Sequence, residues 1–178
     1  MILSIDLGTK NFSFCILKDK KILDWSCFEI GSTKDSDSKI CSSLLEKLDA
    51  LNFEKYKGLT VLIEKQTAKN TRTLKMFGFV FMYFTLLKQK NPKVITKILG
   101  YHAGNKLKYY EFQKGDEPLD LGHLKKGYYK NKVLSKEHTK RVLLQNKESN
   151  EWIKMFTESK KQDDLGDSFL MALAYTKL

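Results

Sequence analysis

The sequence is poor in cysteine and proline and contains no long hydrophobic run. Its three cysteines, Cys15, Cys27 and Cys41, have no CxxC spacing and no histidine-rich neighbourhood, which argues against a zinc site or a disulfide framework. Free thiols are typical of a reducing compartment, so we expect an intracellular protein. No stretch of about 18 apolar residues occurs, and the N-terminal region lacks a basic segment followed by a long apolar core. We therefore expect neither a membrane partner nor a signal peptide.

Acidic residues are in the minority, and the signatures of several enzyme classes are missing. The chain has 32 lysines and arginines against 21 aspartates and glutamates, which gives a formal charge of +11. An excess of this size favours nucleic acid over an anionic membrane or an acidic protein as the partner. HExxH, GxSxG and Walker A patterns do not occur, so the sequence supports no rival chemistry and no small-molecule substrate.

The apolar pattern predicts a single α/β domain over residues 1–178, with a mixed sheet covered by helices on both faces. Three short apolar runs joined by turns predict an antiparallel meander, and the later strands alternate with helical patterns. The expected order is strands at 2–7, 12–17 and 22–30, a helix at 36–51, a strand at 59–64, a helix at about 71–88, a strand at 93–99, and then further helices.

Residues 101–135 differ in composition, because glycines and tyrosines alternate there with many lysines. We predict a long loop or hairpin inserted in the domain, whose aromatic rings stack on bases and whose lysines contact phosphates. A solvated surface excursion without function is the alternative. The candidate DNA-binding residues in and after this segment are Lys106, Lys125, Lys126, Lys130, Lys136, Lys140 and Arg141.

Carboxylates end two of the predicted strands and begin the last helix. Asp6 closes the first strand, and Glu64 closes a central strand, although glutamate is depleted in strands and rarely buried unpaired. Asp163, Asp164 and Asp167 share one helical face, because residues three and four apart are neighbours on a helix. Buried carboxylates are costly unless they hold cations. In a strongly basic chain, this pattern is typical of a nuclease that uses divalent metal ions.

The acids and their neighbours also have alternative explanations. Asp6 can be a turn residue before Gly8, and acids in the first turn of a helix are favoured by the helix dipole. Gln66 follows Glu64 by two residues, so both side chains are expected on one side of the strand, where Gln66 can orient substrate or water. Mg²⁺ takes oxygen ligands and retains water, and two ions about 4 Å apart can activate a water and stabilise a leaving 3′-oxygen.

The segments IDLGTKN, VLIEKQ and KKQDDLGDSFLMAL, in this order, resemble the RuvC-like Holliday junction resolvases, particularly the poxvirus branch. The resemblance implies a ribonuclease-H-like fold, a homodimer, and symmetric nicking of four-way DNA junctions with Mg²⁺ or Mn²⁺, leaving 5′-phosphate and 3′-hydroxyl ends. It also implies a role in processing viral genome concatemers and in recombination, and hence a location in the host-cell cytoplasm.

The same resemblance assigns roles to individual acids. Asp6, Glu64 and Asp167 match the family's metal-binding catalytic acids. For the remaining acid, a bacterial D-x-x-D pattern selects Asp164 and a mitochondrial-type pattern selects Asp163. We choose Asp164 as the ligand and keep Asp163 as a supporting residue.

The family's catalytic lysine best matches Lys132, with Lys136 and Lys140 as alternatives. A fixed cation there can stabilise charge that develops on the phosphate. The segment MFGFVFMYFTLL is apolar nearly all round, so its helix is expected either in the deep core or at a dimer face. Other readings are an RNA–DNA hybrid hydrolase, a transposase-like nuclease, or an inert nucleic-acid-binding protein on the same fold.

Overall fold

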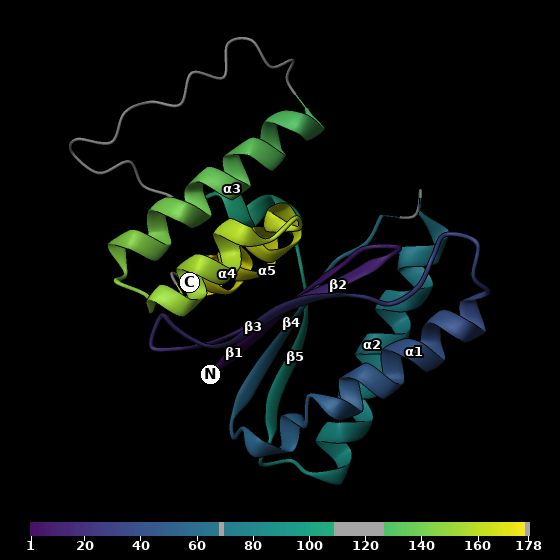
Figure 1. Ribbon diagram of the computed structural model, residues 1–178. Helices are drawn as coiled ribbons and strands as arrows, with labels where there is room; N and C mark the ends of the chain where they lie inside the picture. Colours follow the sequence, from purple (N-terminus) through teal and green to yellow (C-terminus); the bar gives the residue numbers. More distant parts are fainter. Residues whose placement is uncertain (68–69, 109–126, 177–178) are drawn as a thin grey trace.

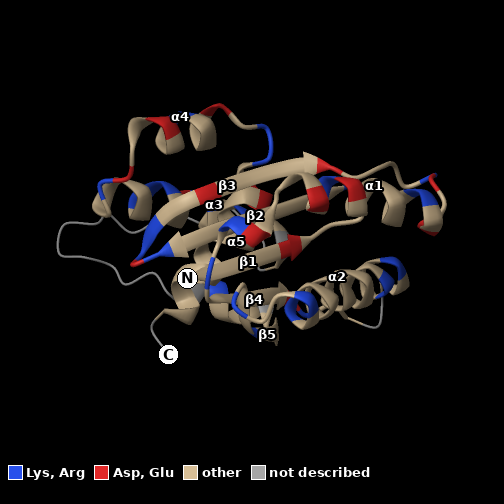
Figure 2. Ribbon diagram, turned by 90° about the horizontal axis from the view of Figure 1, so that it is seen from below, with Lys and Arg blue, Asp and Glu red and all other residues tan. Residues whose placement is uncertain are grey.

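Residues 1–67, 70–108 and 127–176 are described by the computed structural model (Figure 1). Five strands form one sheet in the order β3-β2-β1-β4-β5, which Figure 2 shows side by side. β2 is antiparallel to β1 and β3, whereas β4 is parallel to β1 and β5. The strands are β1 (Ile2–Leu7), β2 (Asn11–Lys18), β3 (Lys21–Glu29), β4 (Leu59–Glu64) and β5 (Ile95–Tyr101).

The helices cover both faces of the sheet (Figure 1). α1 and α2 lie on one face, and α3, α4 and α5 lie on the other. Two short 3-10 helices, η1 and η2, follow α1 and β5. The bounds are α1 (Asp37–Ala50), η1 (Phe53–Lys55), α2 (Thr71–Lys90), η2 (Ala103–Lys108), α3 (Tyr128–Gln145), α4 (Asn150–Glu158) and α5 (Gln162–Tyr175). No helix in the described parts of the chain is both long and apolar enough to cross a membrane.

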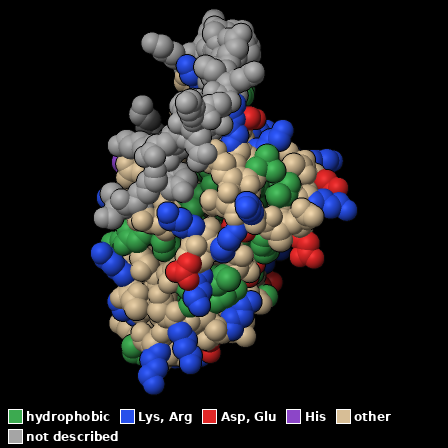
Figure 3. Space-filling view, turned by 90° about the vertical axis from the view of Figure 1, so that its left-hand side faces the viewer, with side chains coloured by type: hydrophobic (Ala, Val, Ile, Leu, Met, Phe, Trp, Pro, Cys, Tyr) green, Lys and Arg blue, Asp and Glu red, His purple; other side chains and the backbone are tan. Residues whose placement is uncertain are grey.

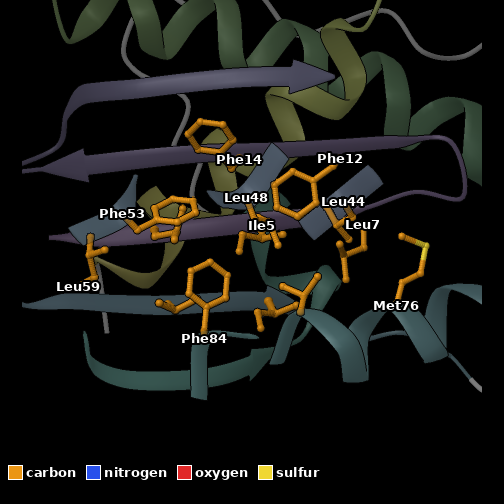
Figure 4. Packing of buried hydrophobic residues seen from close by; sticks show 14 of the residues in the cluster. Ile5, Leu7, Phe12, Phe14, Leu44, Leu48, Phe53, Leu59, Met76 and Phe84 are labelled. Carbon is orange, nitrogen blue, oxygen red and sulfur yellow. The ribbon is translucent and has the colours of Figure 1, made fainter. Parts of the chain in front are cut away.

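The pleat of the sheet divides the core in two. Successive side chains of a strand point to opposite faces, so Leu3 and Ile5 of β1 pack with α1 and α2. Aromatic residues fill this layer, and the rings of Phe53 and Phe84 meet edge to face with their centroids 5.2 Å apart (Figure 4). The alternate positions of β1, among them Ser4, face α5 instead.

Helix α5 is fixed to the other face by apolar packing and by buried hydrogen bonds. Trp25 of β3 stacks on Phe156 with centroids 5.5 Å apart, and its Nε1 donates to the carbonyl oxygen of Leu165 at 3.1 Å. Ser4 Oγ donates to the carbonyl oxygen of Ser168 at 2.5 Å, and the hydroxyls of Ser13 and Ser168 lie 2.9 Å apart. These fixed contacts set the rotation of α5 about its axis.

The predicted loop over 101–135 is wrong for the described part of that span. β5 runs to Tyr101, η2 follows, and α3 begins at Tyr128. The buried face of α3 includes polar residues such as Ser135 and Thr139, so no apolar stripe marked the helix. Residues 109–126, the centre of the predicted insertion, lie outside the described residues. The predicted strands at 2–7 and 59–64 are found with the same bounds, and the ends of the other predicted strands and of the helices at 36–51 and 71–88 differ by at most two residues.

Helix α2 is half core and half surface. Met76, Val80 and Phe84 are buried against the sheet, as expected for a core helix. On its other side Met82 and Leu86 are each 57% exposed. The nearly continuous apolar sequence of α2 therefore supplies both a buried face against the sheet and an exposed apolar face.

Gly166 allows α3 and α5 to approach closely. A Cβ atom at Gly166 would lie 2.7 Å from Thr139 Oγ1 and 3.0 Å from Ser135 Oγ, both on α3. These distances are shorter than real Cβ contacts, so a larger residue forces the two helices apart.

We predict that Gly166→Ala lowers the free energy of unfolding by about 1–3 kcal/mol, because the overpacking outweighs the usual gain of alanine in a helix. Thr139→Ala removes the nearest atom, so the double variant is expected to recover part of the loss. Denaturant unfolding of the two single variants and the double variant gives this coupling. Stabilisation by Gly166→Ala alone would contradict the close contact.

Candidate active site

Two carboxylates meet at the edge of the sheet where parallel strands end. Ile5 pairs with Ile63 in the parallel ladder, so Asp6 and Glu64 occupy neighbouring positions at the carboxyl ends of β1 and β4. Both follow a residue that faces α1 and α2, so both point to the α5 side. The strand order reverses between β1 and β4, because β2 and β3 lie on one side of β1 and β4 and β5 on the other. Ligands of α/β proteins bind at such a point.

Helix α5 and η2 complete the cluster. Asp167 of α5 accepts a hydrogen bond from Ser135 Oγ at 2.6 Å through Oδ1. Its other oxygen, Oδ2, forms an ion pair with the ammonium of Lys106. The same ammonium lies 3.4 Å from Glu64 Oε1, so Lys106 of η2 joins the carboxylates of β4 and α5.

The surroundings of Asp6 disfavour its charged form. Burial raises its pKa well above the usual value, and the neighbouring Glu64 and Asp167 raise it further, while Lys106 opposes the shift. The pKa of Asp167 is also raised, chiefly by burial, although Lys106 and Ser135 act in the opposite direction. Burial disfavours the ammonium of Lys106, but the attraction of Asp167, Glu64 and Asp6 raises its pKa overall. The cluster thus has a shortage of positive charge.

Asp163 and Asp164 have different partners. Asp163 Oδ2 lies 2.5 Å from Lys132 Nζ, and although partial burial acts to raise the pKa of Asp163, this ion pair lowers it overall. Asp164 accepts a hydrogen bond from Asn11 Nδ2 at 3.0 Å, and its pKa is raised by burial and by the adjacent Asp163. Asp163 therefore already has a cation, whereas Asp164 is oriented by a neutral amide.

One cavity of about 470 Å³ contains these groups. The five candidate acids and Lys132 all contribute to its wall, although they come from β1, β4, α3 and α5. Gln66 also lines it, but its Nε2 donates to the backbone carbonyl of Glu64 at 3.2 Å. The remaining lining residues are Leu7, Gly8, Thr9, Asn70, Thr73, Gly104, Lys106 and Asn131.

The predicted DNA-binding lysines are distributed differently. Lys106 lies inside the carboxylate cluster, where the sequence predicted a phosphate-binding loop residue. The others in the described chain lie on α3: Lys130, Lys136 and Lys140, and Arg141, whose Nε is 3.0 Å from Glu137 Oε1. Lys125 and Lys126 lie outside the described residues. On the face shown in Figure 3, lysine and arginine side chains outnumber acidic ones.

The donor set suits a hard divalent cation, although Lys106 now lies among it. Within the described parts of the chain, no three carboxylate, histidine or cysteine side chains are arranged as a ready-made metal site. The ammonium of Lys106 contacts two of the acids, Glu64 and Asp167. Carboxylate oxygens are the ligands that Mg²⁺ and Mn²⁺ prefer. Asp6, Glu64 and Asp167 are the residues that would hold such an ion.

The sequence did not indicate two residues that shape the cluster, Ser135 and Asn11, and it gave a third, Lys106, a different role. Ser135 orients Asp167, Asn11 orients Asp164, and Lys106 neutralises part of the negative charge. No spacing rule pointed to them, because each comes from a different element from the acid that it contacts. Asn11, however, is the last residue of the IDLGTKN segment, so the motif itself could have indicated it.

The chain shares its fold with solved Holliday junction resolvases. The yeast mitochondrial Holliday junction resolvase Ydc2 matches with a TM-score of 0.59 at 21% identity, over 99% of this chain and 78% of that one. RuvC of T. thermophilus in complex with a Holliday junction substrate gives 0.57 at 11% identity, over 98% and 91%. Another Thermus thermophilus RuvC structure gives 0.52 at 10% identity, over 98% and 92%.

The likeness shows a ribonuclease-H-like fold of the RuvC type. The predicted fold class is confirmed. No model of a known protein family matches the sequence, and no curated protein sequence matches it significantly. Support for the fold and for the cluster of acids therefore comes from the structure and not from a sequence match.

We predict that Asp6→Asn stabilises the metal-free protein at neutral and alkaline pH. A carboxyl whose pKa is raised by folding binds more protons in the folded state, so its contribution to stability falls as pH rises above about 4. Asparagine removes this penalty, and each 1 kcal/mol gained raises the Tm by about 2–4 °C in a chain of this size.

Thermal unfolding with EDTA at pH 5 and pH 8 measures the effect, which is expected to be larger at pH 8. Asp19→Asn makes the same chemical change at an exposed turn and serves as the control. An Asp6→Asn protein less stable than wild type at pH 8 would overturn the electrostatic interpretation.

Proposed function

We propose that the protein is a structure-selective DNA endonuclease that resolves four-way junctions with Mg²⁺ or Mn²⁺ and leaves 5′-phosphate ends. The observation that carries the proposal is the convergence of Asp6, Glu64, Asp167 and Lys106 in one cavity at the carboxyl ends of β1 and β4. Of two proteins with similar folds, Ydc2 is a Holliday junction resolvase by name, and RuvC was solved in complex with a Holliday junction substrate.

The residues of the cavity have distinct roles in this proposal. Bound divalent ions would activate a water and stabilise the leaving 3′-oxygen of the phosphodiester. Ser135 fixes one oxygen of Asp167, and Asn11 fixes Asp164, so both carboxylates are held before substrate arrives. We infer that Asp164, rather than Asp163, joins the ligand set, because Lys132 already compensates the charge of Asp163.

Lys106 is a stronger candidate than Lys132 for the catalytic lysine. Its ammonium contacts two of the three central acids, so it can stabilise charge on a phosphate held beside them. Lys132 is paired with Asp163 at the margin of the cavity. A role of Lys132 in contacting DNA agrees with that position. The poxvirus origin, the role in processing viral genomes and the cytoplasmic location remain predictions from the sequence.

We predict that wild-type protein cleaves a four-way junction with Mg²⁺, and that Asp6→Asn, Glu64→Gln and Asp167→Asn each lower the rate by at least about 100-fold. Losing a ligand removes electrostatic stabilisation that acts only in the transition state. Lys106→Met is expected to lower the single-turnover rate more than binding, and Lys132→Met to do the reverse.

A substrate panel separates the rival functions. It contains a four-way junction, a replication fork, a linear duplex and an RNA–DNA hybrid, with both nicks mapped on the junction. Preferred cleavage of the hybrid indicates a ribonuclease, and binding without cleavage indicates an inert binding protein. Lys39→Ala, on α1 and paired with Asp35, is the control for general loss of positive charge.

We propose further that the enzyme is a homodimer formed through the exposed side of α2. Paired nicks need two active sites, and the described residues of one chain form a single carboxylate cavity of this kind. Leu74, Met82 and Leu86 lie at helical spacing and are 43%, 57% and 57% exposed, and Phe81 is 36% exposed. An apolar strip of this kind on a folded chain marks an interaction site, and a two-fold axis buries the same patch on both subunits.

We predict that Met82→Glu with Leu86→Glu yields a folded monomer, because charges in an apolar interface are desolvated without partners. Light scattering after size-exclusion chromatography measures the mass. Leu144→Glu is the control, since Leu144 is equally exposed at 57% but lies on α3, across the sheet. A dimer that survives the double change would place the interface elsewhere.

A further inference from the structure

A second hollow lies directly beside the carboxylate cavity and has the opposite charge. Its volume is about 520 Å³, and its wall comes from the first turns of α3, the connection between α4 and α5, and the first turn of α5. Four lysines and one aspartate line it, together with Tyr129 and Val133. The lysines are Lys132, Lys136, Lys160 and Lys161.

The two hollows share a wall. Lys132 and Asp163 line both, and their 2.5 Å ion pair stands between them. A polyanion whose one phosphate reaches Asp6 and Asp167 can therefore continue into the lysine-lined hollow without crossing another element. We call this second hollow the lysine groove.

The lysines of the groove differ in whether they form ion pairs with acidic residues of the protein. Lys132 is paired with Asp163, whereas Lys160 and Lys161 are exposed and form no ion pair within the described residues. Surface lysines without a fixed acid can take phosphate contacts without first breaking a bond in the protein. Lys160 and Lys161 lie directly before α5, three and two residues ahead of Asp163, so the start of this helix places the lysines beside the acids.

Tyr129 adds a second type of contact. It is 75% exposed at the start of α3 and lines the groove together with the lysines. An aromatic ring beside cationic side chains is the combination with which proteins hold an unpaired nucleotide, because every base has a face that stacks. A flat membrane surface does not fit a concave hollow. An acidic peptide would gain nothing from the adjoining carboxylate cavity, which repels it.

We propose that the lysine groove binds the sugar-phosphate backbone of the DNA strand next to the scissile phosphate, and that Tyr129 stacks on an unpaired base of that strand. The inference rests on the proposed nuclease function and deepens it. It explains preference for branched DNA by the protein's own residues, since bases near a branch point leave the stack more readily than bases within a duplex.

The test compares Lys160→Ala/Lys161→Ala with wild type in junction binding at several salt concentrations and in single-turnover cleavage at saturating DNA. Removing one phosphate contact lowers the salt slope by about 0.9 for duplex or about 0.7 for single-stranded DNA. We expect affinity to fall by at least about tenfold, the slope to fall by about 1–2, and the cleavage rate at saturation to change by less than about threefold.

Lys154→Ala is the matched control, because Lys154 is an exposed lysine of α4 outside the groove. Tyr129→Leu is expected to weaken binding to a junction more than to a linear duplex, and Tyr129→Phe to retain wild-type binding, since stacking needs only the ring. These comparisons separate phosphate contact from stacking.

The outcomes distinguish failure of the groove from failure of the function. Wild-type affinity and salt slope in Lys160→Ala/Lys161→Ala, with wild-type cleavage intact, would overturn the groove alone. Absence of DNA cleavage by wild-type protein would overturn the nuclease function. If Lys160→Ala/Lys161→Ala binds DNA like wild type but loses a binding to anionic vesicles or to poly-glutamate that wild type shows, the groove belongs to a different partner and the proposal is overturned.

Discussion

Partial burial of three carboxylates at one edge of the sheet is the constraint on which this structure depends. Asp6, Glu64 and Asp167 come from three elements, and burial together with mutual repulsion raises the pKa of Asp6 and Asp167. Such a cluster of carboxylates lowers the stability of the folded protein, and clusters of this kind are typical of functional sites. Lys106 offsets part of the cost, and a divalent cation would offset more.

The rest of the fold holds the acids in place despite their repulsion. The parallel pairing of β1 with β4 aligns Asp6 with Glu64. The buried hydrogen bonds of Ser4 and Ser13 with Ser168 fix the rotation of α5. Gly166 admits α3 close enough for Ser135 to reach Asp167. The two apolar layers beside the sheet supply the stability that the site lacks.

The sequence predicted the meander and most later elements, because strand alternation and helical spacing are local signals. It also predicted that acids from two strands and the last helix belong to one site, since glutamate or aspartate at the end of an apolar strand is unusual. Lys106 in the cluster and the helix from Tyr128 were not predicted. Both depend on contacts across the fold: Lys106 meets acids that are 42 and 61 residues away, and α3 buries polar side chains against α5.

The central claim is that the partly buried acids form a binding site for divalent cations, and calorimetric titration with Mn²⁺ tests it most directly. Wild type is expected to bind Mn²⁺, Asp6→Asn and Glu64→Gln to lose at least about tenfold in affinity, and Asp24→Asn, on β3 beside Tyr56, to bind like wild type. Wild-type Mn²⁺ affinity in both Asp6→Asn and Glu64→Gln would contradict the claim.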